Sequence, residues 1–182
     1  KRLRGTLDVF GPAALKGVPI IGVEPSCTAV LRSDLEELLP DDPRSAAVAK
    51  MTMTLAELLT DPELGPDESW WDGRLEGTQI ITQPHCHQYA VMGYGPDMEV
   101  MTRLGAQVKE LAGCCGLAGN FGMEKGHYDI SVAVAENQLL PALRQAEDGT
   151  IFLADGYSCR TQAEQLAGTK GVSLPTLLHQ RA

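Results

Sequence analysis

The stretch from Leu111 to Gly122 constrains this chain most, because it places two adjacent cysteines between glycines. Cys114 and Cys115 are poor disulfide partners for each other, since an ordinary disulfide needs Cα atoms farther apart than those of neighbouring residues. The flanking glycines let the backbone adopt positive φ and approach another group closely. Two thiols in such a backbone indicate a metal ion or a cluster more than a packed core.

Composition limits the class of protein. The 182 residues are enough for one domain with a real core, and 43% of them are hydrophobic. No apolar run is long enough to span a membrane, and no signal peptide is visible. The net charge of −9 argues against nonspecific nucleic-acid binding. The five cysteines are an odd number in a chain too large to need disulfide staples, which favours free thiols or metal ligands in a reducing, cytoplasmic compartment.

Short apolar runs alternate with helical patterns along the chain. The expected strands are 18–23, 78–82, 107–111 and 150–154. The expected helices are 3–15, 28–39, 45–59, 88–94, 97–104, 129–143, 162–167 and 174–179, with a break or kink at Gly11-Pro12 and a kink at Pro141. This alternation predicts an α/β fold with a parallel, Rossmann-like sheet, helices on both faces and right-handed crossovers.

All five cysteines are expected in the same kind of place, a few residues after a strand and before a helix. They are Cys27, Cys86, Cys114, Cys115 and Cys159. In a parallel sheet these positions share the carboxyl-terminal edge, where ligands bind. Helix N-termini at that edge add a positive field and free N–H groups, which suit an anionic thiolate cluster. The pattern therefore predicts one metal or cluster site built from distant cysteines.

The residues themselves leave the kind of site open. Zinc could use four of the thiols, but the close C-x2-C spacing of structural zinc is absent. Iron–sulfur chemistry fits soft thiolates at least as well, although the ferredoxin run of cysteines is absent too. A catalytic cysteine with His85 or His87 as its base is a third option. Because these histidines flank Cys86, they cannot both point where its thiol does, and a supporting role beside the ligands is the alternative.

Four motifs in order resemble a known family, and the resemblance covers nearly all of the chain. They are Glu24-Pro-Ser-Cys27, Pro84-His-Cys-His87, Gly113-Cys-Cys-Gly116 and Asp155-Gly-Tyr-Ser-Cys159 with their following residues. The family is the cysteine-rich CCG domain of heterodisulfide reductase and of the iron–sulfur subunits of glycolate and anaerobic glycerol-3-phosphate dehydrogenases. The motifs look closest to the C-terminal part of long FAD-linked oxidoreductases of the 2-hydroxyacid dehydrogenase type.

The resemblance implies a pseudo-duplicated α/β unit, each half carrying the pattern C…CCG…CxxC and binding a [4Fe-4S]-type cluster. Residues 1–77 would be the C-terminal part of the first half-repeat plus a linker, and residues 78–182 the second half-repeat, in one compact domain. Cys27 matches the last cysteine of the first half, and the other four match the second half. Two departures stand out, because Gln162 replaces the last cysteine of one CxxC and Glu24 the first cysteine of the other.

By resemblance, all five cysteines would ligate the iron–sulfur centre, with His85, His87, Gly116 and Gln162 around them. The function implied is electron transfer in an FAD-linked oxidoreductase that oxidises a 2-hydroxyacid-like substrate. FAD and ferredoxin-like clusters would lie elsewhere in the parent protein, and an electron acceptor would be the further partner. The chain starts without Met and reads as a fragment that is not catalytic alone, and any membrane association would come through partners. The alternatives are a zinc-bound or metal-free docking domain, and a thiol enzyme using Cys114 or Cys115.

Overall fold

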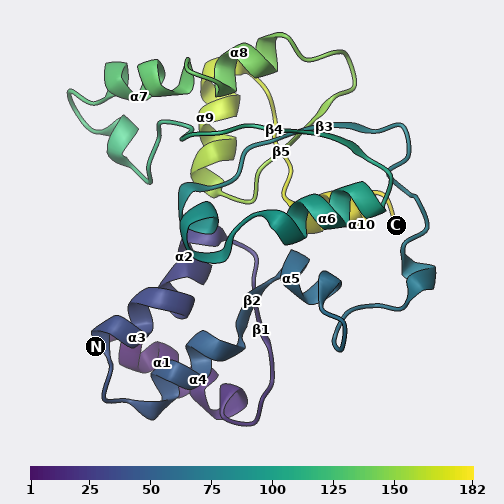
Figure 1. Ribbon diagram of the computed structural model, residues 1–182. Helices are drawn as coiled ribbons and strands as arrows, with labels where there is room; N and C mark the ends of the chain where they lie inside the picture. Colours follow the sequence, from purple (N-terminus) through teal and green to yellow (C-terminus); the bar gives the residue numbers. More distant parts are fainter.

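The computed structural model describes residues 1–182, the whole of the sequence (Figure 1). Its α-helices are α1 Arg2–Ala14, α2 Pro25–Ala29, α3 Leu35–Leu38, α4 Pro43–Met51, α5 Leu55–Thr60, α6 Gly95–Arg103, α7 Tyr128–Ala135, α8 Leu139–Arg144, α9 Tyr157–Ala167 and α10 Leu174–Gln180. Its strands are β1 Ile20–Gly22, β2 Thr52–Thr54, β3 Gln79–Thr82, β4 Gln107–Glu110 and β5 Ile151–Leu153. Two π-helical segments, Val30–Asp34 and Gln88–Met92, each begin a few residues after a cysteine.

The larger sheet is parallel, with the strand order β4-β3-β5. Its side chains alternate between two apolar clusters, as the two-residue period of a strand requires. Ile80 and Leu153 pack in the cluster that contains Val100 of α6 and Leu174 of α10. Ile81 joins a second cluster with residues of α8 and α9. Helices therefore cover both faces of this sheet (Figure 1), which confirms the expected α/β class with parallel strands.

The structure holds two sheets where one was expected. β1 pairs with β2 in a separate parallel sheet, with Ile20 opposite Thr52. The helices α1, α3 and α4 pack around this smaller sheet through a cluster that includes Leu7 and Leu35. Ala56 of α5, by contrast, is fully buried in the cluster below the larger sheet, so the two sheets share part of one core. Cys27 consequently follows a strand of the smaller sheet, while the other cysteines belong to the larger one.

The prediction of one helix over 45–59 was wrong. α4 ends at Met51, the strand β2 follows directly, and α5 begins at Leu55. Thr54 explains the new start, because its side chain accepts from the N–H of Glu57 while the Glu57 carboxylate accepts from the N–H of Thr54. This capping box starts a second helix and leaves three residues extended between the two, where they pair with β1.

The single helix expected over 129–143 is also two helices. α7 ends at Ala135 and α8 begins at Leu139. Pro141 accounts for the break, since it has no N–H to donate and its ring collides with the carbonyl four residues earlier. A kink in the last turn was expected, but the chain instead leaves the helix at Gln138, which has φ −145° and ψ −47°.

Three helix ends differ from the sequence-based expectation. α2 begins at Pro25 and α9 at Tyr157, so Cys27 and Cys159 lie inside the first helical turns and not ahead of them. Pro12 does not end α1, which continues to Ala14. None of the helices combines the length and the apolar character needed to span a membrane.

Asp97 is a charged residue that the fold buries. It lies in α6, is 2% exposed, and lines a narrow hollow with Thr28 and Thr54 from the elements around the smaller sheet. Burial and, next, the negative charge of Asp155 raise the pKa of the Asp97 carboxyl from 3.8 to about 7, while a hydrogen bond from Gln88 acts in the opposite direction. The native state therefore binds a proton at Asp97 far more tightly than the unfolded chain does.

We predict a pH-dependent loss of stability that depends on Asp97. The folded pKa is raised, so the contribution of Asp97 to stability is fully present below about pH 4 and is lost as the pH rises from about 4 to about 7. Asp97→Asn should remove that fall and stabilise the protein at pH 8 by on the order of 3 kcal/mol. Urea unfolding at pH 4.5 to 8 checks this, with the exposed neighbour Glu99→Gln as control. Parallel stability curves for wild type and Asp97→Asn would refute it.

Candidate functional site

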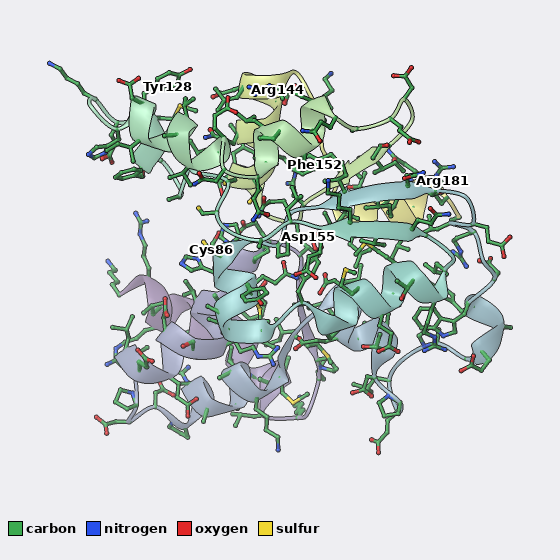
Figure 2. The ribbon with its side chains drawn as sticks, turned by 45° about the horizontal axis from the view of Figure 1, so that its top comes forward. Cys86, Tyr128, Arg144, Phe152, Asp155 and Arg181 are labelled. Carbon is green, nitrogen blue, oxygen red and sulfur yellow. The ribbon has the colours of Figure 1, made fainter.

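Four of the five cysteines follow the three strands of the larger sheet. Cys86 comes after β3, Cys114 and Cys115 after β4, and Cys159 after β5. Because these strands are parallel, their carboxyl-terminal ends reach the same edge of the sheet. Figure 2 places Cys86 at this edge, below the helix that carries Tyr128. Residues that lie 28 to 73 positions apart in the sequence are thus brought to one place by strand order alone.

The four thiols lie near one another in succession, close enough for one to shift the pKa of the next. Cys86 interacts with Cys114, Cys114 with its neighbour Cys115, and Cys115 with Cys159. The N–H of Gly116 also donates to the sulfur of Cys114, at 3.3 Å. Cys86 is exposed and Cys114 is half-buried, whereas Cys115 and Cys159 are 3% and 2% exposed. This thiol string, Cys86–Cys114–Cys115–Cys159, therefore runs from the surface into the interior.

The proximity of the thiols disfavours their ionisation. The hydrogen bond with Cys115, followed by burial, raises the pKa of Cys114 well above its ordinary range. At Cys115 the contact with Cys114 lowers the pKa, but the contact with Cys159 and burial outweigh it, so that the pKa is about 11. Burial raises the pKa of Cys86 as well. All three groups are neutral thiols at pH 7 in this arrangement.

The thiols of the string do not form a coordination shell around a common point. No three histidine, cysteine or acidic side chains converge in a geometry that could hold a metal ion as they stand. Each thiol lies near its neighbour in the string, but the four do not surround a common point. The donor set is nevertheless chemically suitable, since thiols are the soft ligands that iron–sulfur clusters and zinc both accept. The ligand set expected from the sequence remains a prediction.

Cys27 stands outside the string, although its helix is tied to that of Cys159. Its N–H donates to the carboxylate of Glu24 at 3.0 Å. The same carboxylate accepts from the hydroxyl of Ser26, and the nearby backbone N–H of Tyr157, at the start of α9, also lowers its pKa. Burial opposes the charged form of Glu24, but these hydrogen bonds prevail and its pKa is lowered. Burial, then the nearby Glu24 charge, raises the pKa of Cys27.

The two histidines of the Cys86 loop differ in environment. His85 is 5% exposed, and its Nε2 lies 3.3 Å from the hydroxyl of Ser158. Its Nδ1 accepts from the N–H of His87 at 3.2 Å, which fixes the ring beneath the loop. Burial lowers the pKa of His85, so its ring is neutral at pH 7. His87 is exposed, and its side chain makes no hydrogen bond to the protein. Neither ring contacts the Cys86 thiol, which leaves the sequence-based option of a histidine base unsupported.

The glycines of the cysteine loop approach the protein's own backbone. Gly116 has φ +94°, and a Cβ there would lie 2.2 Å from the carbonyl oxygen of Ser131 in α7. A Cβ on Gly122 would lie 2.3 Å from the Ser131 hydroxyl. The Nε2 of Gln162 donates to that hydroxyl at 2.9 Å. Gly116 and Gln162 thus share Ser131 as a packing partner beneath the cysteine pair.

Sequence analysis missed two residues that shape this site. Glu24 was noted only as a departure from the family pattern, yet a carboxylate directly before Pro25 is typical of a helix N-cap and could have been read as one. Ser131 gave no signal, because a serine within an apolar helical stretch is ordinary. Its importance comes from two glycines and a glutamine that are distant in sequence.

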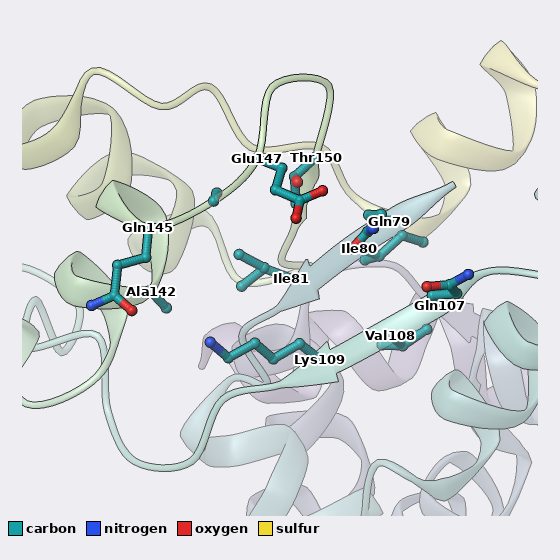
Figure 3. Close-up of a pocket in the computed structure, with 11 residues that line it drawn as sticks. Gln79, Ile80, Ile81, Gln107, Val108, Lys109, Ala142, Gln145, Glu147 and Thr150 are labelled. Atoms are coloured by element: carbon teal, nitrogen blue, oxygen red, sulfur yellow. The ribbon is translucent and has the colours of Figure 1, made fainter. Parts of the chain in front are cut away.

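Two hollows lie near the larger sheet. One of about 280 Å³ lies beside Cys86 and is lined by Pro84, Tyr89, Leu111 and neighbouring backbone, so the exposed end of the thiol string opens into it. The other, also of about 280 Å³, lies over β3 and β4 toward their amino-terminal ends (Figure 3). Its lining combines apolar side chains such as Ile81 and Val108 with amides, one lysine, one glutamate and one threonine, and it contains no cysteine or histidine.

Comparisons with known proteins point to dehydrogenases. The chain is 27% identical over 180 residues to D-2-hydroxyglutarate dehydrogenase of Escherichia coli (strain K12), which covers 96% of this chain and 16% of that protein. It is 29% identical over 170 residues to the enzyme of the same name from Haemophilus influenzae, covering 91% and 16%. One subunit of the anaerobic glycerol-3-phosphate dehydrogenase of Escherichia coli (strain K12) is 24% identical over 172 residues, covering 91% and 41%.

The chain therefore spans about a sixth of the length of the D-2-hydroxyglutarate dehydrogenases and two fifths of the length of the matched subunit of the glycerol-3-phosphate enzyme. No protein-family model matches the chain, and no solved structure matches it. The relatives are dehydrogenases or a subunit of one, which agrees with the oxidoreductase class that the cysteine motifs led us to expect.

We predict that Gly156, next to the thiol string, tolerates no side chain. A Cβ there would lie 2.4 Å from Cδ2 of His85 and 3.2 Å from the sulfur of Cys159. Gly156→Ala should therefore lower the free energy of unfolding by about 1–3 kcal/mol through overpacking. Gly95→Ala is the control, because no atom lies within 4 Å of a Cβ at that position. Equal urea midpoints for the two variants would contradict the prediction.

Proposed function

We propose that this chain is an iron–sulfur electron-transfer domain of an FAD-linked oxidoreductase that oxidises a 2-hydroxyacid-like substrate. The observation that carries the proposal is the thiol string, in which four cysteines that follow three parallel strands lie near one another at one edge of the sheet. Structural cysteines in a core have no reason to gather in this way, whereas ligands of one centre must do so.

The relatives support the oxidoreductase part of the proposal. D-2-hydroxyglutarate is a 2-hydroxyacid, and it is named as the substrate of the dehydrogenases that match 90% or more of this chain. Those proteins are about six times as long as the aligned segment. The flavin, the substrate pocket and ferredoxin-like clusters would thus lie in other parts of the parent protein, and this chain alone would not be catalytic. An acceptor would complete the electron path, in the cytoplasm.

Four cysteines are the proposed ligands of the second half. Cys86, Cys114, Cys115 and Cys159 would hold a [4Fe-4S]-type cluster, whose chemistry is reversible one-electron transfer. The N-terminus of α9 lies next to Cys159 and adds a positive field there, which suits an anionic cluster. Arg160 of the same turn is engaged with the carbonyl oxygens of Ala154 and Asp155, so it stiffens the loop before Cys159.

Cys27 would belong to the first half of a duplicated unit, with residues 1–77 and 78–182 as the two halves. Their topology supports this division. From β1 the chain passes through α2, the helix that carries Cys27, and later returns to pair β2 in parallel with β1. Thr54, the last residue of β2, then caps α5. β5 likewise runs through α9 to Val172, which bridges Leu153 in parallel, after which Ser173 caps α10. On this proposal Cys27 serves a first-half centre, separate from the thiol string.

A metal-free or zinc-bound docking domain is the second candidate function. The observation that favours it is the open geometry of the thiols, in which no three donors converge. A domain of this kind would use the same fold to attach the flavoprotein to a partner. Stoichiometric zinc, or no metal, in protein produced under anaerobic and iron-replete conditions would select this candidate.

We predict that Cys115→Ser abolishes iron binding while the protein stays folded. Wild-type chain, purified anaerobically and reconstituted, should contain about four iron atoms with matching sulfide and absorb near ~400 nm. Cys115→Ser should lose most of the iron, because this thiol lies in the middle of the string. Cys27→Ser should retain the second-half iron. Circular dichroism verifies the fold, and full iron content in Cys115→Ser would refute the proposed ligand set.

A further inference from the structure

Two buried glutamines hold opposite ends of the cysteine loop. Gln83 follows β3 and is 1% exposed, and its Nε2 donates to the carbonyl oxygen of Gly113 at 3.0 Å. Gln162 is 2% exposed and lies one turn after Cys159 in α9. Its Nε2 donates to the hydroxyl of Ser131, against which Gly116 packs. The cysteine pair therefore lies between two anchored glycines.

The orientation of the Gln83 amide follows from its surroundings. Nε2 faces two carbonyl oxygens, those of Pro84 at 3.1 Å and Gly113 at 3.0 Å. A flipped amide would set its own oxygen against both, so the N–H donors must point this way. The Oε1 that results is buried and has no hydrogen-bond partner. An unpaired buried acceptor costs stability, and an apolar residue would avoid that cost. What the side chain of Gln83 contributes here is thus its N–H donors.

We propose that Gln83 and Gln162 are positioning residues, which fix the backbone of Cys114 and Cys115 in the shape that the metal-binding site requires. Gln83 fixes the Gly113 end and Gln162, through Ser131, the Gly116 end. The cysteine motif resembles a pattern with a cysteine at position 162, but here the amide is turned toward Ser131 and serves the loop instead. The inference rests on the proposed function for its metal readout, while the positioning itself is measurable without metal.

Uncharged amides suit this task. They donate to carbonyl and hydroxyl oxygens without adding a charge to a group of thiols whose pKa values already respond to one another. Gln138 contributes a weaker contact at the entrance of the loop, where its Oε1 accepts from the N–H of Ala112 at 2.8 Å. This side chain is exposed, so water can replace it. The two buried glutamines, Gln83 and Gln162, therefore account for the positioning of the loop.

The test compares alkylation of each cysteine in the metal-free, reduced protein by mass spectrometry. Gln83→Leu keeps the approximate volume and removes the donors, and Gln83→Glu sets a carboxylate against two carbonyl oxygens. Both should increase the labelling rate of the buried Cys115 about tenfold. Cys159 is equally buried, so its unchanged rate separates opening of the loop from global unfolding. The exposed Gln145→Leu is the matched control and should behave as wild type.

Variants of Gln162 and Ser131 provide an independent test of the same proposal. Gln162→Leu and Ser131→Ala should each speed labelling of Cys115, and the double variant should do no more than either alone, because both remove one contact. In anaerobically reconstituted protein, the Gln83 and Gln162 variants should shift the visible spectrum and the reduction potential at retained iron content. If the double variant showed the sum of the two single effects on the labelling rate, Gln162 and Ser131 would not act through one shared contact.

The outcomes separate the two proposals. If wild type binds no iron but the Gln83 variants expose Cys115 selectively, the positioning role holds and the proposed function fails. If wild type binds iron and all variants match it in labelling, spectrum and potential, the proposed function holds and the positioning role is wrong. Joint acceleration of Cys115 and Cys159 labelling in the Gln83 variants would likewise overturn the positioning role, since it would mean general destabilisation.

Discussion

The carboxylate of Glu24 lies between the starts of two helices that follow strands of different sheets. It accepts a hydrogen bond from the N–H of Cys27 in the first turn of α2, and the nearby N–H of Tyr157, in the first turn of α9, helps to lower its pKa. A negative charge at two positive helix ends is stabilised by both, which outweighs its burial and lowers its pKa. The two cysteine-bearing helices therefore start from one shared anion, and Cys27 is held near the edge that bears the thiol string.

Parallel strand order does the rest of the assembly. β3, β4 and β5 end at the same edge, so three strand ends bring four thiols to one place without any contact between the cysteines having to drive folding. The loops that carry them are held by short contacts to the scaffold, such as the packing of Gly116 against Ser131. The sheet sets the positions of the cysteine loops, and the polar groups beneath each loop set its detailed geometry.

The sequence was sufficient to predict the strands of the larger sheet and that each of its cysteine motifs follows a strand, because apolar runs and turn residues mark such strands locally. It could not predict β2, since Thr52 to Thr54 are extended only through pairing with β1. The break between α7 and α8 was underestimated, although Pro141 signals it. The partner of Gly116 was beyond reach, because the choice between a bound group and the Ser131 backbone depends on contacts across distant segments.

The raised pKa values of Cys114 and Cys115 keep these thiols neutral. Ionising one buried thiol beside others places a charge in a poorly solvated cluster, so Cys114 and Cys115 remain protonated at neutral pH. Neutral thiols do not repel, so they can lie close together without forcing the loops apart. A metal ligand must be a thiolate, so any soft cation bound as proposed would have to displace these protons, and its binding would weaken as the pH falls.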